Sequence, residues 1–258
     1  GDCACVWERG NLCYLIDGGS STVHEVGKYR ILPFLKAMGI REVDGIFLSH
    51  MDRDHTNGIV RLLEMIEKRE TVLKVRRLFL SRSKETEEEV QQIANLGKKA
   101  GCQVIFIEKG STIKAEGMEI ICMAPEREDL ESNAGSQVLH IKAGDLDMLF
   151  TGDTEGQGEE ELTETLSREG QTYEILKVAH HGSKNSTSMK FLDAAGPSAA
   201  VISCGQNNFY GHPHKELLQR LEDKGIPVFS TKDGGAVLLR WDGENAYMSF
   251  HCKEIMVK

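Results

Sequence analysis

The sequence predicts an α/β (α+β) fold in which two mixed β-sheets form a sandwich with helices on the outer faces, an αββα arrangement. Three observations lead to this prediction. Strand-like and helix-like segments alternate throughout the 258 residues. A β-rich stretch followed by an α/β stretch occurs twice in succession, once in each half of the chain. Nothing between the halves reads as a linker, so we expect a single domain over residues 1–258.

The composition is typical of a soluble, globular protein. Charged residues make up 28%, apolar residues 40%, and the formal net charge is −9. This acidic balance argues against a general nucleic-acid binder, because such domains are usually basic, but it leaves open an enzyme whose metal ions meet a phosphate. No apolar run approaches the roughly 18 residues that a membrane-spanning helix needs. The N-terminus lacks a signal-peptide pattern and reads as a strand, so we expect a fragment of a larger protein.

The chain has seven cysteines. An odd number without a CxxC pair indicates neither a disulfide framework nor a cysteine-rich zinc site. We therefore expect most of these cysteines to be small buried apolar residues.

The first half is expected to open with a β-hairpin, residues 2–7 and 12–17, which turns around Glu8-Arg9-Gly10. Apolar residues at Ile59, Leu62, Leu63 and Ile66 have helical spacing and place a helix over 58–68. The other elements expected in this half are a helix over 29–38, a strand over 43–49, a strand over 72–80, a helix over 85–101 and a strand over 103–108.

The second half is expected to open with four antiparallel strands and to continue with alternating helices and strands. The expected strands are 111–116, 118–124, 136–143, 146–152, 174–179, 199–204, 227–230, 235–241 and 245–251. The expected helices are 158–168, 188–194 and 214–224.

The strongest chemical signal is the segment His50-Met51-Asp52-Arg53-Asp54-His55, directly after the apolar strand residues IFLS. It places four potential metal ligands within six residues, and we expect them on one loop whose position is fixed by the end of the strand. His50 and Asp52 suit one metal ion, and the Asp54-His55 pair can turn to a second ion nearby.

Two further segments follow apolar strands in the same way. Thr151-Gly152-Asp153 comes after MLF, and His180-His181-Gly182-Ser183 comes after ILKVA. In each segment a glycine permits a close turn beside a ligand-type residue. This recurrence is what a metal site built on strand ends would produce.

The motifs HxDxDH, TGD and AHHGS, in this order, resemble the metallo-β-lactamase fold, whose usual motif is HxHxDH. Further segments resemble the C-terminal domain of the ComEC family of DNA-uptake proteins, over essentially the whole chain. They are Gly1-Asp2, LIDGGS, Asn133-Ala134-Gly135-Ser136, Tyr210-Gly211-His212-Pro213-His214 and Thr231-Lys232-Asp233-Gly234-Gly235.

The resemblance implies two divalent metal ions, Zn²⁺ or Mn²⁺. The ligands it implies are His50 and Asp52 for one ion, Asp54 and His55 for the other, Asp153 as the bridge, and one of His180 and His181 to complete the second site. The neighbouring histidine would then face the substrate, and which of the two binds metal stays open. Asp17 is implied to hold the HxDxDH loop by hydrogen bonds.

The sequence departs from the usual motif because Asp52 stands where a histidine is expected. His140 lies in the middle of a strand, and we do not expect it to bind metal. The first site is then rich in oxygen ligands and short of one protein ligand, which shifts its preference toward Mn²⁺ or Mg²⁺.

Two metal ions about 3.5–4 Å apart would share a water, lower its pKa to give hydroxide, and stabilise the oxygens that attack and leave at phosphorus. Asp54 would accept the proton of the water or orient it. His212 or His214 would protonate the leaving oxygen or hold the phosphate, with a structural turn as the alternative role. Ser183 and Ser186 would bind phosphate oxygens. Asn133 and Ser136 either support the site or cap a turn.

We therefore expect a metal-dependent phosphodiesterase, a DNA nuclease linked to DNA uptake. The alternatives are a hydrolase of a small phosphodiester such as a phosphorylcholine ester, and a non-catalytic DNA-binding or assembly module of a transporter. If the family resemblance holds, the natural protein has a membrane-channel portion, and this domain lies outside the cytoplasm. A free-standing cytoplasmic relative would fit the unpaired cysteines better.

Overall fold

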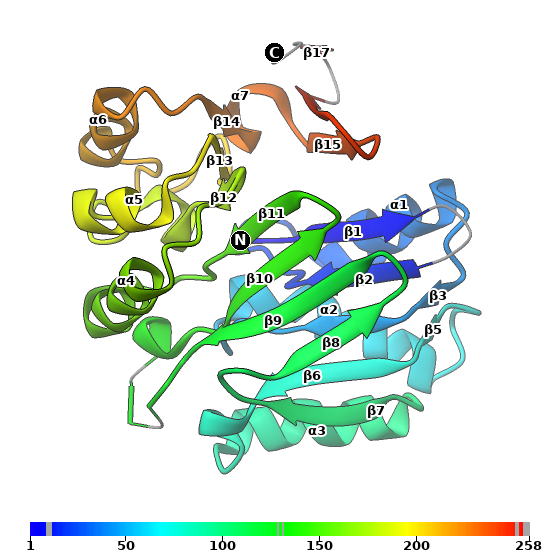
Figure 1. The fold of residues 1–258 in the computed structure, drawn as a ribbon. Helices are drawn as coiled ribbons and strands as arrows, with labels where there is room; N and C mark the ends of the chain where they lie inside the picture. The colour runs from blue at the N-terminus through cyan, green and yellow to red at the C-terminus, as the bar shows by residue number, and fades with distance from the viewer. Residues whose placement is uncertain (9–11, 128, 131, 251–252, 255–258) are drawn as a thin grey trace. The chain divides into compact units, whose positions relative to one another are not determined.

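The computed structural model describes residues 1–8, 12–127, 129–130, 132–250 and 253–254 (Figure 1). The chain divides into two compact units, Gly1–Glu108 (unit 1) and Lys109–Lys258 (unit 2), and each is described by itself. Part of the expected hairpin turn, Arg9-Gly10, and His251 at the end of the last expected strand lie outside the described residues.

Unit 1 contains a five-stranded sheet with the order β1-β2-β4-β6-β7. The hairpin of β1 and β2 is antiparallel, as the sequence predicts. The remaining neighbours are parallel. The bounds are β1 Ala4–Glu8, β2 Leu12–Ile16, β4 Gly45–Phe47, β6 Arg77–Ser81 and β7 Gln103–Ile107. A separate parallel pair joins β3 (Glu42–Val43) to β5 (Lys74–Val75).

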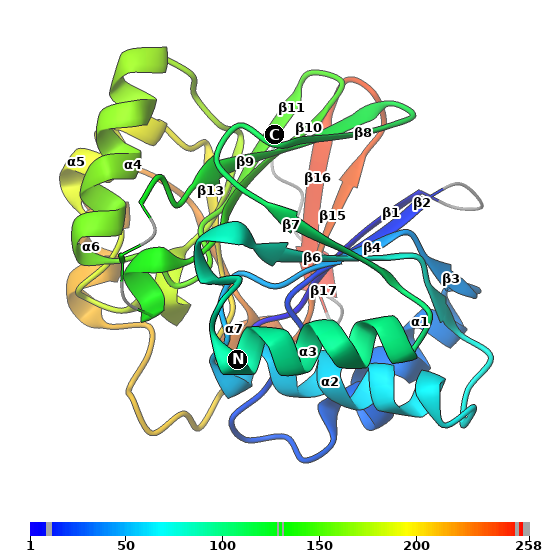
Figure 2. The same cartoon turned by 90° about the horizontal axis from the view of Figure 1, so that it is seen from below.

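The helices of unit 1 lie along one face of this sheet (Figure 2). They are η1 Gly27–Ile31, α1 Leu32–Ala37, α2 Arg53–Glu67 and α3 Glu88–Lys99, with the short turn η2 Arg82–Lys84 before α3. Leu62 of α2 and Leu78 of β6 are fully buried in the core between helices and strands. The apolar side of α2, which the spacing of its apolar residues predicts, therefore faces the sheet.

The start of α2 corrects one expectation. The helix was expected from residue 58, but it begins at Arg53, so Asp54 and His55 lie in its first turn and not on a loop. Asp52 occupies the N-cap position, and the carboxylate of Asp54 lies near the positive end of the helix dipole. The apolar periodicity starts one turn later than the helix because the first turn carries the polar motif.

Unit 2 contains a seven-stranded sheet with the order β14-β13-β12-β11-β10-β9-β8. Strands β8 to β11 pair antiparallel, and strands β11 to β14 pair parallel. The bounds are β8 Thr112–Ala115, β9 Met118–Ala124, β10 Val138–Ala143, β11 Leu146–Phe150, β12 Ile175–Lys177, β13 Ala199–Ile202 and β14 Val228–Ser230. A three-stranded sheet follows, with β15 Val237–Trp241, β16 Ala246–Phe250 and β17 Lys253–Glu254.

The helices of unit 2 are α4 Gly156–Glu169, α5 Met189–Ala195 and α6 Lys215–Asp223, and they lie together in both ribbon views (Figures 1 and 2). Leu166 of α4, Phe191 of α5 and Leu217 of α6 are buried in one core with residues of the parallel strands. Short turns complete the unit, namely η3 Ser132–Gly135, η4 Ala179–Gly182 and α7 Thr231–Gly234. Neither α7 nor β17 was expected.

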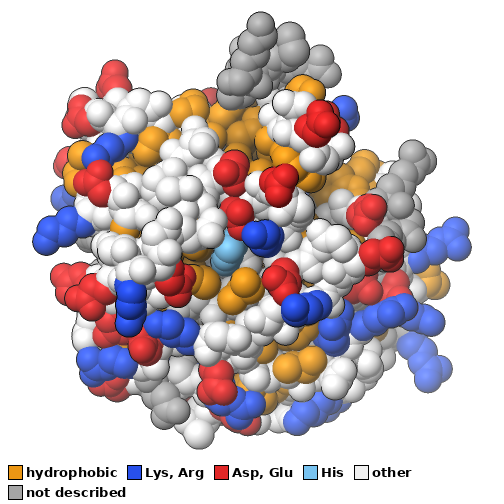
Figure 3. All heavy atoms as spheres, viewed as in Figure 1, with side chains coloured by type: hydrophobic (Ala, Val, Ile, Leu, Met, Phe, Trp, Pro, Cys, Tyr) orange, Lys and Arg blue, Asp and Glu red, His pale blue; other side chains and the backbone are white. Residues whose placement is uncertain are grey.

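The predicted fold class is confirmed, because both units combine mixed sheets with packed helices. Of the six cysteines that the structure describes, Cys13, Cys102, Cys122 and Cys204 are buried, which agrees with the sequence. Among the described residues, no helix combines the length and the apolar character needed to cross a membrane. On the face drawn in Figure 3, Lys and Arg side chains are interspersed with Asp and Glu.

Candidate metal centre

The HxDxDH segment of unit 1 begins three residues after β4 and continues into α2. His50 and His55 are both buried, and their ring centroids lie 4.1 Å apart. Nδ1 of His50 lies 3.0 Å from the hydroxyl oxygen of Ser49. That hydroxyl donates its own proton to Asp17 at 2.7 Å, so Nδ1 of His50 is the donor to Ser49 and Nε2 carries the lone pair.

Asp17 organises this segment from the end of β2. Its backbone has a positive φ of 55°, and its carboxylate is buried. The carboxylate accepts hydrogen bonds from the backbone N–H of Ser49 at 2.7 Å and from Nδ1 of His55 at 2.9 Å. His55 is therefore also protonated at Nδ1 and directs Nε2 away from Asp17, which is the usual arrangement of a metal-binding histidine.

The carboxylates of the motif differ in their surroundings. Asp52 is half exposed, and its interaction with the His50 ring 3.7 Å away lowers the pKa of its carboxyl against the opposing effect of burial. Asp54 lies in the first turn of α2, and its backbone carbonyl accepts a hydrogen bond from the N–H of Asp2 at 3.0 Å. Asp2 thus joins the motif, with a ligand-type oxygen within 4.8 Å of a ring nitrogen of His55. Sequence reasoning used Asp2 only as part of the family resemblance.

In unit 2, Asp153 follows β11 and is buried. Its carboxylate lies 3.5 Å from Nε2 of His181 and 3.9 Å from Nε2 of His180. Its backbone N–H donates to the hydroxyl of Ser136 at 3.3 Å. Ser136 therefore supports the turn that carries Asp153.

His180 and His181 both adopt left-handed backbone conformations, with φ of 48° and 53°. For residues other than glycine such a conformation costs about 1 kcal/mol or more, so the surrounding contacts hold the turn in place. Nδ1 of His181 donates to the backbone carbonyl of Ser203 at 3.0 Å, which leaves the lone pair on Nε2, facing Asp153. Nδ1 of His180 is 2.9 Å from the carboxylate of Glu155.

Glu155 is a second residue that sequence reasoning missed. Besides His180, its carboxylate accepts a hydrogen bond from the side chain of Asn133 at 3.3 Å. The sequence offered one signal that Glu155 belongs near the site, namely its position two residues after Asp153.

His212 and His214 form a ring cluster with the histidine pair. The centroid of His212 lies 5.6 Å from that of His180, 6.2 Å from that of His181 and 4.7 Å from that of His214. Burial, reinforced by the neighbouring histidines, lowers the pKa of His212 to about 4, so the ring is neutral at neutral pH. Nδ1 of His214 accepts a hydrogen bond from the backbone N–H of Lys184 at 3.0 Å. This bond corresponds to the structural role in a turn that the sequence left open as an alternative.

Ser183 and Ser186 are buried within the turn that follows the histidines. The hydroxyl of Ser186 donates to the backbone carbonyl of Ala179 at 3.1 Å, and that of Ser183 accepts the N–H of Asn185 at 3.2 Å. Both hydroxyls therefore shape the turn.

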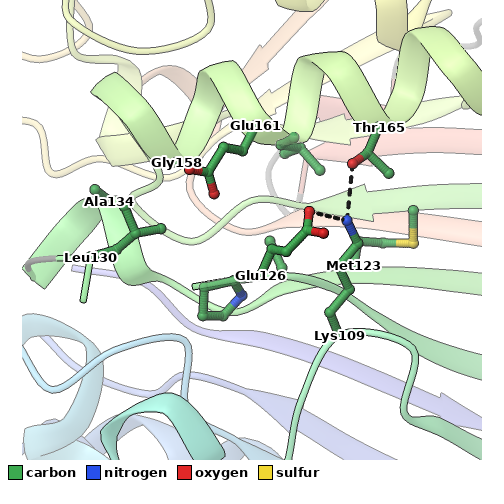
Figure 4. A pocket seen from close by; sticks show the side chains of 11 residues that line it. Lys109, Met123, Glu126, Leu130, Ala134, Gly158, Glu161 and Thr165 are labelled. Atoms are coloured by element: carbon green, nitrogen blue, oxygen red, sulfur yellow. Dashed lines mark hydrogen bonds and ion pairs between the residues drawn. The ribbon is translucent and has the colours of Figure 1, made fainter. Parts of the chain in front are cut away.

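Among the described residues, two of the hollows each lie within a single unit. The hollow beside α4, seen in Figure 4, has Lys109 bonded to Glu126 at 2.6 Å and to Thr165 at 3.1 Å. Its volume of about 10 Å³ suits a single water and not a substrate. In unit 1, residues 20–26 and α2 enclose about 430 Å³, lined by Arg53 and Asn57 of the motif helix among others.

The donor set fits divalent metal ions. His50, His55 and His181 each have Nδ1 engaged as a donor, so each presents Nε2 as a ligand atom. Buried carboxylates accompany them in both units, Asp2 in unit 1 and Asp153 in unit 2. Imidazole nitrogens together with carboxylate oxygens are ligands that suit Zn²⁺ and Mn²⁺.

Comparison with known proteins places this geometry in context. The sequence profile of the metallo-beta-lactamase superfamily matches residues 131–206. ComE operon protein 3 of Bacillus subtilis is 31% identical over 217 residues, which are 84% of this chain and 27% of that protein. Competence protein ComA of Neisseria gonorrhoeae is 32% identical over 250 residues, 90% of this chain and 31% of that protein. The chain thus spans less than a third of the length of these relatives.

Solved structures share the fold. The metallo-beta-lactamase fold protein YhfI from Bacillus subtilis superposes with a TM-score of 0.57 and 14% identity, over 86% of each chain. CmlA, a diiron beta-hydroxylase from Streptomyces venezuelae, gives 0.59 and 15%, over 88% of this chain and 50% of that one. The chain therefore has the metallo-β-lactamase fold, and its sequence resembles a part of the competence proteins.

Proposed function

We propose that this chain is a metal-dependent phosphodiesterase that cleaves DNA during DNA uptake. One observation carries the metal part of this proposal: His50, His55 and His181 are buried, and each is oriented through Nδ1 so that Nε2 can bind a metal ion. The DNA part is supported by the names of two relatives, competence protein ComA of Neisseria gonorrhoeae and recombination protein 2 of Haemophilus influenzae.

The residues that would hold the metal ions follow from the motif. We propose His50 and Asp52 for one ion, Asp54 and His55 for the other, and Asp153 as their shared ligand. Of the two neighbouring histidines we propose His181 as the ligand, because it is the more buried and its Nε2 lies nearer Asp153. Asp2 is an additional candidate, since its carboxylate lies beside His55.

When bound, such a pair of ions would supply Lewis acidity at phosphorus and a water of lowered pKa. The chain's own residues would position the reactants. Asp54 would orient the attacking water. His212, neutral at neutral pH, would donate a hydrogen bond to a phosphate oxygen. Asp17 would keep His55 in the required tautomer.

The test begins with protein stripped of metal and reloaded with Mn²⁺ or Zn²⁺. Metal content is measured by mass spectrometry, and end-labelled single- and double-stranded DNA and bis(p-nitrophenyl) phosphate are offered as substrates. We expect about two ions per chain, DNA cleavage that is stronger with Mn²⁺, and loss of cleavage in Asp153→Ala. The matched control is Asp145→Ala, an exposed aspartate in the turn between β10 and β11.

The other outcomes separate the alternatives. Hydrolysis of the small diester without any DNA cleavage would replace the nuclease by a hydrolase of small phosphodiesters, which the net charge of −9 would suit. A single tightly held ion with no turnover of either substrate would indicate a binding or assembly module. We also propose that the remainder of a longer protein supplies a membrane channel and that this chain lies outside the cytoplasm, which a topology reporter fused to the chain would check.

A further inference from the structure

The connection between β13 and α6 in unit 2 (Figure 1) carries two exposed aromatic residues, Phe209 and Tyr210. The side chain of Phe209 is 97% exposed, and that of the adjacent Tyr210 is 71% exposed. A fold gains nothing from an exposed phenylalanine beside an exposed tyrosine, and such pairs commonly mark a binding surface. The proposed catalytic role of the neighbouring histidines leaves both aromatic residues without a function.

The connection that carries these rings is held by its own hydrogen bonds. The side chain of Asn208 donates to the backbone carbonyl of Gly205 at 2.8 Å and to that of His212 at 2.7 Å. Its amide oxygen accepts the N–H of His212 at 2.7 Å. Asn208 thus closes the loop, and the two aromatic side chains project outward from a fixed base.

The rings continue toward the candidate metal ligands of the same unit. Tyr210 stacks on His212 with a centroid distance of 5.8 Å and an interplanar angle of 24°. His212 in turn lies 5.6 Å from His180 and 6.2 Å from His181. A flat group resting on the free face of Tyr210 would therefore be separated from the histidine pair by two rings, those of Tyr210 and His212.

We propose that Phe209 and Tyr210 form a stacking platform for unpaired nucleobases of a single strand whose phosphate enters the site beside His180 and His181. This proposal rests on the proposed function and names its substrate as single-stranded DNA or a frayed end. Bases inside a duplex are already stacked on one another, so the platform favours a strand that has been separated. Stacking on aromatic faces is tolerant of sequence, so cleavage would show little base preference.

The surrounding residues favour a nucleobase over a lipid surface. Gln206 and Asn207 supply amides that can hydrogen-bond to base edges, and residues 205–214 contain no lysine or arginine. Interfacial segments that bind anionic membranes combine aromatic residues with a cluster of basic ones. Residues 205–214 also lack acidic side chains that would repel a phosphate backbone.

The first measurement is equilibrium binding of fluorescein-labelled (dT)₁₂ to the metal-free chain by fluorescence anisotropy. We expect Phe209→Ala and Tyr210→Ala each to weaken binding about tenfold and Tyr210→Phe to retain it, because the ring is kept. The matched control is Val72→Ala, which removes an apolar side chain that is 85% exposed in unit 1, and it should bind as the parent does. Circular dichroism verifies that each variant is folded.

The second measurement uses the reloaded enzyme with a normal and an abasic single strand. The parent should cleave the normal strand with a KM about tenfold lower than that of the abasic strand, and Phe209→Ala/Tyr210→Ala should cleave both with the same high KM. Equal (dT)₁₂ affinity in the alanine variants and the parent, with DNA cleavage intact, would overturn the platform and leave the nuclease standing. Platform-dependent binding without any cleavage would support the platform and overturn the nuclease. A third outcome would assign Phe209 and Tyr210 to a membrane surface. In that case the parent binds phosphatidylglycerol vesicles and Phe209→Ala does not, while both bind (dT)₁₂ with the same affinity.

Discussion

Replacing Asp17 by asparagine is the sharpest test of the histidine geometry. The buried Asp17 carboxylate accepts three hydrogen bonds, two from Ser49 at 2.7 Å and one from His55 at 2.9 Å. Asparagine keeps one acceptor oxygen for the backbone N–H of Ser49, but its amide group turns a donor toward the Ser49 hydroxyl and the His55 ring. Losing two charge-assisted hydrogen bonds, with partial recovery when His55 changes tautomer, should lower the free energy of unfolding by about 2–3 kcal/mol.

The same substitution should weaken metal binding. If Nδ1 of His55 accepts a hydrogen bond from the new amide group, the ring carries its proton on Nε2, and that nitrogen can no longer bind the metal. Substitutions of this kind usually cost about 10- to 100-fold in metal affinity. Urea unfolding of the metal-free protein and calorimetric titration with Mn²⁺ measure the two effects, with Asp145→Asn as the exposed control. An Asp17→Asn protein with the unfolding midpoint and the metal affinity of the parent would refute the reasoning.

Three further predictions concern packing and protonation. Glu159→Ala should lower the free energy of unfolding by about 2–4 kcal/mol, because the buried Glu159 carboxylate accepts hydrogen bonds from the backbone N–H groups of residues 187 and 188. In the same urea titration, the control Glu160→Ala, at an exposed position, should change the free energy of unfolding by less than about 0.5 kcal/mol. Gly58→Ala should cost at least about 1–3 kcal/mol, because its Cβ would lie 2.1 Å from a backbone oxygen, while Gly205→Ala meets nothing within 4 Å and should melt with the parent. In the metal-free folded protein, the pKa of His212 is lowered from the ordinary 6.5 to about 4. The unfolded state therefore binds the proton more readily, and the free energy of unfolding falls as the pH decreases from 6.5 toward 4. His212→Asn should flatten this part of the stability–pH curve, and an unchanged slope would show that another group titrates there.

The strands and helices were predictable because apolar periodicity reports burial directly. All the strands expected between residues 103 and 241 are present, with ends within about four residues. The start of α2 was not predictable in the same way. Asp54 and His55 are polar residues in a first helical turn, where no apolar pattern exists to mark the helix.

The candidate site was predictable as a set of residues but not as a set of orientations. Three motifs identify ligand-type side chains, yet only the hydrogen-bond partners show which ring nitrogen is protonated. The partner of His181 is a backbone carbonyl, that of Ser203, and a carbonyl leaves no trace in a sequence motif. Asp2 and Glu155 escaped for a related reason, since a lone carboxylate is informative only once its neighbours in space are known.

The left-handed turn at His180 and His181 has a consequence for how this protein would change under selection. Asparagine or glycine would relieve the backbone of both positions, so a selection for thermal stability alone would favour replacing the histidines. A selection that also requires the proposed metal binding would retain His181 and accept a less stable backbone at this position. At this turn, thermal stability and the proposed metal binding favour different residues. A heat-adapted relative that keeps both histidines must have acquired its stability elsewhere in the chain.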